Sequence, residues 1–222
     1  MTHLEIEINK VRQYAIEMMH IVKSQLQKGR EAFFTANNNL ALEVLHNERR
    51  VNGYELLIDS ECENIIALLN PVAVDLRFLL ATLKINYHLE RIADNTKSIA
   101  KNVVEMHPKW DESFLKKLQI EKAFDVAESM LNDVIESFEK EDTAMANKVF
   151  EKDKIIDGIT DRCLPIIAEY IKASSEDIGR DIYLLLIQKK LERIGDLVKN
   201  IAEEIIFYIE AKILKHHAKA EI

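Results

Sequence analysis

Two pairs of carboxylates recur in this chain with the same spacing and the same neighbours. Residues 89–100 read LERIADNTKSIA and residues 191–202 read LERIGDLVKNIA, so eight of twelve positions are identical at a separation of 102 residues. Each copy carries a Glu and an Asp four residues apart: Glu90 with Asp94, and Glu192 with Asp196. A repeat period near half of the 222 residues indicates two copies of one structural unit.

Two further pairs with the same spacing lie in the segments NERRVNGYE and EKDKIIDGI: Glu48 with Asn52, and Asp153 with Asp157. If adjacent helices align these pairs, each half gathers three or four oxygen ligands, which suits a hard cation. The alternative is a solvated charged face, because like charges four residues apart destabilise a helix by a few tenths of a kcal/mol unless they are neutralised. On such a face the countercharge comes from Arg91, Arg193, Lys97 and Lys199.

Helical periodicity places the repeated carboxylates away from the core. At about 100° per residue, Leu89 falls on the same apolar stripe as Ile92, whereas Glu90 and Asp94 lie roughly 160° from it. The second copy has a matching stripe that includes Leu191. Packing therefore does not require the carboxylate pairs, and they are expected on the outward face.

The composition predicts an all-α protein. The chain has 48% hydrophobic residues but only five Gly and three Pro, too few turn-formers for a β fold. Turn-forming and helix-capping residues divide the chain into six long helical segments of about 30 residues. Each segment would be roughly 45 Å long at 1.5 Å per residue. The expected fold is two tandem elongated three-helix bundles related by the internal repeat, with domains at 1–107 and 108–222.

Capping residues predict where the helices begin. Thr2 with Glu5 forms a capping box, and the turn at residues 37–39 opens the second helix. The other expected starts are Asn70 and Pro71 for the third helix, Asp111 for the fourth, Asp142 or Thr143 for the fifth, and Ser174 or Ser175 for the sixth. Pro165 lies inside the expected fifth helix, where it removes a backbone donor.

Charge and hydropathy narrow the possible partners and the location. A net charge of −8 disfavours binding to nucleic acid or to an anionic membrane. The N-terminal MTHLEIEINKVRQ lacks the apolar run of a signal peptide, and no apolar stretch reaches the roughly 20 residues of a spanning helix. We therefore expect a cytoplasmic protein without membrane insertion, in which Cys62 and Cys163 are buried apolar groups.

A second chemistry is open to the chain. Glu17 with His20 and Glu43 with His46 both make Glu-x-x-His, the spacing used by ferritin-like di-iron carboxylate oxidases and storage proteins. Such bundles need both motifs to point into one core. The apolar stripe of the first helix includes Val11, and it leaves Glu17 and His20 to one side. The spacing therefore keeps this alternative open but does not favour it.

The stretches NPVAVDLRFLLATLKINYHLERIADNTKSIAK at 70–101 and LLLIQKKLERIGDLVKNIAEE at 184–204 resemble the PhoU family of phosphate-transport regulators. The paired E-R-I-x-D signatures and the P-x-A-x-D-L-R entry at 71–77 carry the resemblance. It implies two tandem three-helix bundles, a cytoplasmic homodimer, and negative control of phosphate uptake and of the phosphate-starvation response. The implied partners are the ATPase of the phosphate ABC transporter (PstB-like) and a sensor histidine kinase (PhoR-like). No catalytic activity is implied.

The resemblance also implies iron, zinc or another divalent or trivalent cation on the bundle surface. The residues that match the family's ligands are Glu48, Glu90 and Asp94 in the first half and Asp153, Asp157, Glu192 and Asp196 in the second. Asn52 stands where a carboxylate would bind more strongly, so the second site is expected to be the stronger one. For docking on partners, the expected residues are Arg77, Arg91 and Arg193.

Overall fold

The computed structural model describes residues 2–106, 110–174, 178–212 and 214. These residues form seven α-helices, and no strand occurs among them, so the predicted all-α fold is confirmed. In chain order the helices are α1 His3–Thr35, α2 Asn38–Leu69, α3 Val74–Met106, α4 Glu112–Leu118, α5 Ile120–Lys140, α6 Thr143–Ser174 and α7 Ile178–Glu210. The boundary expected between residues 107 and 108 lies outside the described residues.

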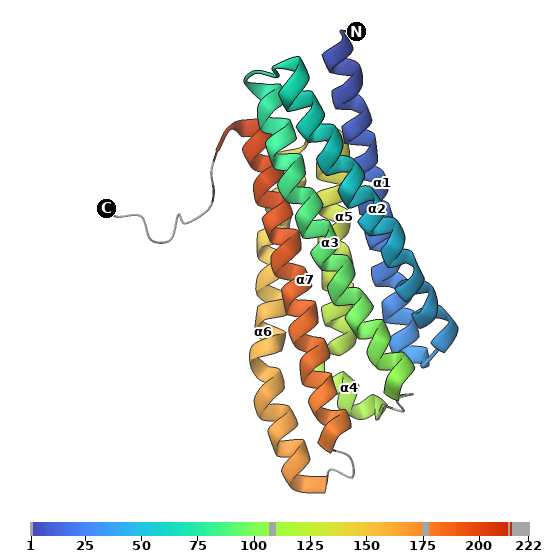
Figure 1. Ribbon diagram of the computed structural model, residues 1–222. Helices are drawn as coiled ribbons and strands as arrows, with labels where there is room; N and C mark the ends of the chain where they lie inside the picture. The colour runs from blue at the N-terminus through green and yellow to red at the C-terminus, as the bar shows by residue number, and fades with distance from the viewer. Residues whose placement is uncertain (1, 107–109, 175–177, 213, 215–222) are drawn as a thin grey trace.

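The six long helices form two layers (Figure 1). In the first layer α2, α3, α7 and α6 lie side by side in that order, because α3 packs against α2 and α7, and α7 packs against α6. In the second layer α1 packs on α2 and α3, and α5 packs on α6 and α7. Each half is thus an elongated three-helix bundle, and α3 and α7 join the halves by running alongside each other in opposite directions.

The apolar stripes predicted around the repeated motifs lie in the core. Leu89 and Leu191 are both 0% exposed. The buried side chains of the two halves make one continuous core, in which Phe78 on α3 packs edge-to-face on Tyr208 of α7 with ring centroids 5.5 Å apart. Both cysteines are buried as expected, and burial raises the pKa of Cys62 to about 12. Within the described ranges, no helix is long and apolar enough to cross a membrane.

Most of the predicted helix starts are confirmed. Thr2 and Glu5 form the reciprocal capping box at α1, and the Asn37 side chain accepts hydrogen bonds from backbone N–H groups at the start of α2. Asp111 caps α4, and Asp142 accepts a hydrogen bond from Ala144 N at 2.9 Å at the start of α6. At the sixth expected start, Ser174 belongs to the end of α6 and Ser175 lies outside the described residues.

The third helix begins later than predicted. Asn70 is the left-handed C-cap of α2, with φ 48°, and α3 starts at Val74 rather than at Pro71. A residue before proline is disfavoured in the right-handed helical region, and asparagine tolerates the left-handed one. The Asn70–Pro71 pair therefore ends the second helix instead of opening the third.

The predicted fourth helix is divided in two. Gln119 takes a left-handed conformation, φ 56°, and separates α4 from α5. The break lets α4 fold across the end of α6, where the Phe114 and Tyr170 rings stack with centroids 3.7 Å apart. The six expected helices are therefore seven in the structure. The break at Gln119 accompanies a tertiary contact, and no Gly or Pro marks it in the sequence.

Candidate functional site

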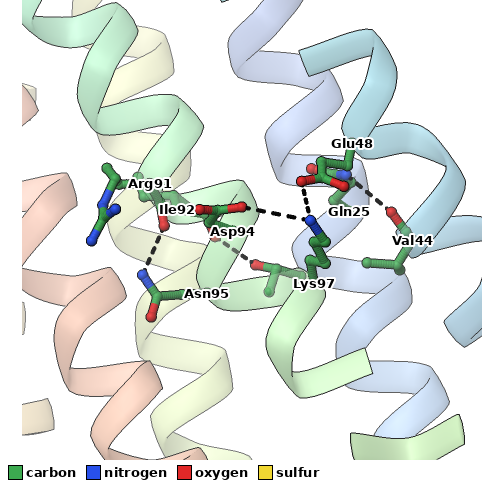
Figure 2. Close-up of polar contacts among 9 residues, drawn as sticks. Gln25, Val44, Glu48, Arg91, Ile92, Asp94, Asn95 and Lys97 are labelled. Atoms are coloured by element: carbon green, nitrogen blue, oxygen red, sulfur yellow. Dashed lines mark hydrogen bonds and ion pairs between the residues drawn. The ribbon is translucent and has the colours of Figure 1, made fainter. Parts of the chain in front are cut away.

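The first cluster of carboxylates lies between α2 and α3. It comprises Glu48 and Glu55 on α2, with Glu90 and Asp94 on α3. Lys97, one turn beyond Asp94, joins the two helices: its ammonium group donates a hydrogen bond to Glu48 and lies 4.0 Å from Asp94 Oδ1 (Figure 2). The carboxylates are partly buried rather than fully outward, because the two helices pack closely around them.

Burial and the crowding of like charges raise the pKa values of two carboxylates in the first cluster. The pKa of Glu90 rises to about 7, first because burial disfavours its charged form and then because Asp94 and Glu55 are nearby. Burial also raises the pKa of Glu55, with further contributions from Asp59 and Asp94. Asp59 accepts a hydrogen bond from Asn86 Nδ2 at 2.8 Å. The cluster therefore concentrates negative charge along the seam between α2 and α3.

The second cluster repeats this arrangement between α6 and α7. It comprises Asp153 and Asp157 on α6, with Glu192 and Asp196 on α7. Lys199 Nζ donates a hydrogen bond to Asp153 and another to Asp196 at 3.1 Å. Although burial acts against it, these two bonds raise the pKa of Lys199. Burial, followed by the charge of Asp153, raises the pKa of Asp157.

The two bridging lysines are equivalent in the repeat, since 199 − 97 is the same 102-residue offset as that of the motifs. On the neighbouring helices the offset is 105 residues, which matches Glu48 with Asp153 and Asn52 with Asp157. The countercharge expected for a solvated face is therefore present, and it comes from a lysine that crosses to the adjacent helix. In each half this lysine bridges two of the four carboxylates, one on each helix. In the second half Lys189 pairs separately with Glu192 at 2.7 Å.

One carboxylate of the first cluster was missed from the sequence. Asn52 is exposed, and Glu55 brings the fourth carboxylate to the first cluster. Glu55 lies seven residues after Glu48, which places both on the same face of α2. That seven-residue spacing is the signal in the sequence, and it does not belong to the pattern of pairs four residues apart. The expectation that the second site is stronger rested on departures from the family pattern, Asn52 among them, and Glu55 removes the part of that basis that Asn52 supplied.

A metal ion does not fit the clusters as they are arranged. The ammonium groups of Lys97 and Lys199 lie between the carboxylates that a cation would need. In the described part of the chain, no group of three or more His, Cys, Asp or Glu side chains is placed to hold a metal ion. A cation would have to displace a lysine, so metal binding by the predicted ligands stays a prediction.

The two Glu-x-x-His motifs do not converge on one site. Glu17 accepts a hydrogen bond from Tyr54 Oη at 2.7 Å, and His20 Nε2 lies 3.1 Å from Glu139 on α5. Glu43 pairs with Lys28 at 2.6 Å. Each motif thus contacts its own surface neighbours, and the ferritin-like alternative gains no support from their positions.

The three arginines expected to bind partners are spread over the first layer. Arg77 is half-buried near the start of α3, and Arg91 is exposed 14 residues further along, roughly 21 Å away at 1.5 Å per residue. Arg193, the repeat equivalent of Arg91, is exposed on α7. They offer separate positive contacts rather than a single patch.

Known proteins resemble the chain over nearly its whole length. The model of a family described as PhoU domain matches residues 15–103 and 120–205. The phosphate-specific transport system accessory protein PhoU of Escherichia coli K12 is 28% identical over 210 residues, covering 95% of this chain and 86% of that protein. A Burkholderia homologue of that accessory protein is 30% identical, with coverage of 97% and 92%.

Two solved structures share the fold. The crystal structure of PhoU from Pseudomonas aeruginosa superposes with a TM-score of 0.88 at 26% identity, covering 95% of this chain and all of that one. The phosphate transport system regulatory protein PhoU from Streptococcus pneumoniae gives 0.84 at 23% identity, covering 96% and 99%. At this lower identity, the likeness to the Streptococcus pneumoniae structure supports only the two-bundle architecture.

Proposed function

Because the chain belongs to the PhoU family, whose members are accessory proteins of phosphate transport, we propose that it is a regulatory adaptor of phosphate homeostasis. In this role it negatively controls phosphate uptake and the phosphate-starvation response. It acts by docking, as a cytoplasmic homodimer, on the ATPase of the phosphate ABC transporter and on a sensor histidine kinase. The role needs no turnover of a substrate.

A duplicated pair of exposed apolar residues supports docking. Leu80 on α3 and Ile182 on α7 are 102 residues apart, and they are 41% and 45% exposed. Packing within the chain does not explain them, since both repeats leave the same position open to solvent. Exposed apolar side chains mark contact surfaces when they gather in a patch, and recurrence of the same exposed position in both repeats is the observation that selects these two. The motif helices α3 and α7 are therefore the proposed docking elements.

The docking surface is tested by a pull-down from cells grown in high phosphate, read for the transporter ATPase and the sensor kinase. We expect Leu80→Ser/Ile182→Ser to recover several-fold less of either partner than the unaltered protein does. Leu42→Ser is the matched control, because Leu42 is 51% exposed on α2 and its repeat equivalent is Asn147. Equal recovery from all three proteins would remove α3 and α7 as docking elements.

Negative control is tested by deletion of the gene. We expect phosphate-starvation genes to stay expressed when phosphate is plentiful, and the unaltered gene to restore repression. Normal repression in the deletion strain, together with no binding to either partner, contradicts the adaptor role. The ferritin-like alternative predicts oxygen consumption when the purified protein is given ferrous iron, and the adaptor predicts none. Sedimentation of the purified chain tests the proposed homodimer.

A further inference from the structure

A basic hollow lies between α3 and α7. It has a volume of about 340 Å³, and its lining includes Arg91, Asn95, Ser98 and Lys101 from α3 and Lys190 from α7. Figure 2 shows Arg91 and Asn95 on the side of α3 that faces away from Glu48. Asp94 and Lys97 also line the hollow, so it shares these two side chains with the first carboxylate cluster.

Two of the cations in this hollow are not neutralised. Arg91 and Lys190 have no carboxylate oxygen within 4.0 Å among the residues that the structure describes. Lys101 lies 3.4 Å from the exposed Glu105, a surface contact that salt and solvent weaken. Among the described residues, Asp94 is the one carboxylate that lines the hollow, and Lys97, 4.0 Å away, offsets its charge. In a chain of net charge −8, the hollow is therefore a local site of positive charge.

The internal repeat supplies a comparison that separates binding from packing. With the 102-residue offset, the positions of Lys101, Asn95 and Lys190 correspond to Glu203, Leu197 and His88. α3 and α7 pack against each other at both places, and Arg91 recurs as Arg193, yet the two lysines and the Asn95 amide occur only at the first. The contact between these helices therefore does not need the basic set.

The side chains in the hollow match the chemistry of a tetrahedral oxyanion. A guanidinium group offers a planar fork of donors and a lysine offers a point charge, the two modes by which proteins hold phosphate. Asn95 Nδ2 donates to Arg91 O at 2.7 Å, which fixes the amide beside the arginine. We propose that the α3–α7 hollow binds a phosphate group through Arg91, Lys101 and Lys190, either as free phosphate or on a small phosphorylated molecule.

Calorimetric titration of the full-length protein with inorganic phosphate, and separately with ADP, tests the site. We expect Arg91→Ser/Lys190→Ser to weaken binding of the probe at least tenfold, because both unpaired cations are lost. Arg193→Ser is the matched control, since it removes the equivalent arginine from the other half and is expected to change affinity less than twofold. Circular dichroism checks that all variants keep the helical content of the unaltered protein.

The two probes distinguish the sources of the phosphate group. Phosphate binding that the double substitution abolishes assigns the site to the free anion. Binding of ADP alone, equally sensitive to the substitution, assigns it to a phosphorylated molecule. Binding of neither probe, or binding that Arg91→Ser/Lys190→Ser leaves unchanged, overturns the proposal. These measurements need no transporter or kinase. A negative result would therefore overturn the phosphate site without contradicting the adaptor role.

Discussion

On α7, Lys199 Nζ lies 3.1 Å from Asp196 Oδ1, and the same ammonium group donates a hydrogen bond across to Asp153 on α6. Asp153 is only 4% exposed. A carboxylate withdrawn from water needs a partner charge or hydrogen bonds, and Lys199 supplies both. The countercharge of the second cluster therefore comes from the chain itself. Lys97 supplies the countercharge of the first cluster in the same way.

Removal of this countercharge should destabilise the fold. We expect Lys199→Met to lower the free energy of unfolding by about 2 kcal/mol, because a buried carboxylate loses its partner. Lys97→Met should lower it by about 1 kcal/mol, since the Glu48 side chain is 18% exposed and that of Asp153 is 6% exposed. Urea unfolding in the presence of a chelator measures both.

Two controls separate the lost pair from a general effect of methionine. Lys199→Met/Asp153→Asn should regain most of the stability, because no unpaired charge remains. Lys154→Met removes a lysine whose pair with Glu151 is highly exposed, and it should change the free energy of unfolding by less than about 0.5 kcal/mol. An equal loss from Lys154→Met and Lys199→Met would contradict the importance of burial.

The same lysine should compete with a metal ion at the second cluster. Lys199→Met keeps the length of the side chain and removes its charge, so the affinity for zinc or manganese should rise by about tenfold, equivalent to about 1.4 kcal/mol. Calorimetry and elemental analysis measure the change. Replacing Asp153, Asp157, Glu192 and Asp196 by Ala should abolish binding, and metal content that this change leaves unaltered would show that the clusters are not cation sites.

Stability should depend on pH through Glu90. Its pKa of about 7 in the folded chain lies above the ordinary 4.5, so the folded state binds more protons between these values. The free energy of unfolding therefore falls as pH rises through this window and is not lowered further above it. Glu90→Gln should raise stability by about 1 kcal/mol at pH 8, a figure reduced for solvent screening, and should have little effect at pH 4.

Thermal unfolding in a chelator at both pH values checks this dependence. Glu63→Gln is the matched control, because Glu63 is an exposed carboxylate on α2 outside the cluster. It should change the midpoint little at either pH. A gain from Glu90→Gln of the same size at pH 4 and pH 8 would show that the gain does not come from the charge of Glu90.

Features that depend on local sequence were predictable. The stripe that buries Leu89 and Leu191 follows from helical periodicity, and the capping box of Thr2 and Glu5 needs only neighbouring residues. The duplicated carboxylates were visible for the same reason, since a repeat shows in the sequence whatever surrounds it. The presence of a countercharging lysine was also foreseen, but not its partner on the adjacent helix.

Features that depend on contacts between helices were not predictable. The break at Gln119 follows from the way α4 packs on α6, and no local signal marks it. Glu55 joins the first cluster because α2 and α3 align it with Glu90, whereas its repeat equivalent, Thr160, accepts a hydrogen bond from Gln188. The relative rotation of two helices decides such cases, and the sequence of either helix alone does not contain it.

Two helical glycines should respond in opposite directions to the same substitution. A Cβ on Gly29 of α1 would lie 2.9 Å from Thr96 Cγ2 on α3. Thr96 is fully buried, and its hydroxyl donates to Ile92 O at 3.0 Å, so its methyl group has little freedom to move aside. We expect Gly29→Ala to force α1 and α3 apart and to lower the free energy of unfolding by about 1–3 kcal/mol.

Gly53 on α2 is the matched case, because it is exposed and a Cβ there would meet nothing within 4 Å. Gly53→Ala should raise stability by about 0.5–1 kcal/mol through better helix propensity alone. Urea unfolding measures both variants, and Thr96→Ser, which removes the obstructing methyl group, should recover much of the loss in Gly29→Ala. If Gly29→Ala proves as stable as Gly53→Ala, α1 and α3 do not approach as closely at Thr96 as the packing indicates.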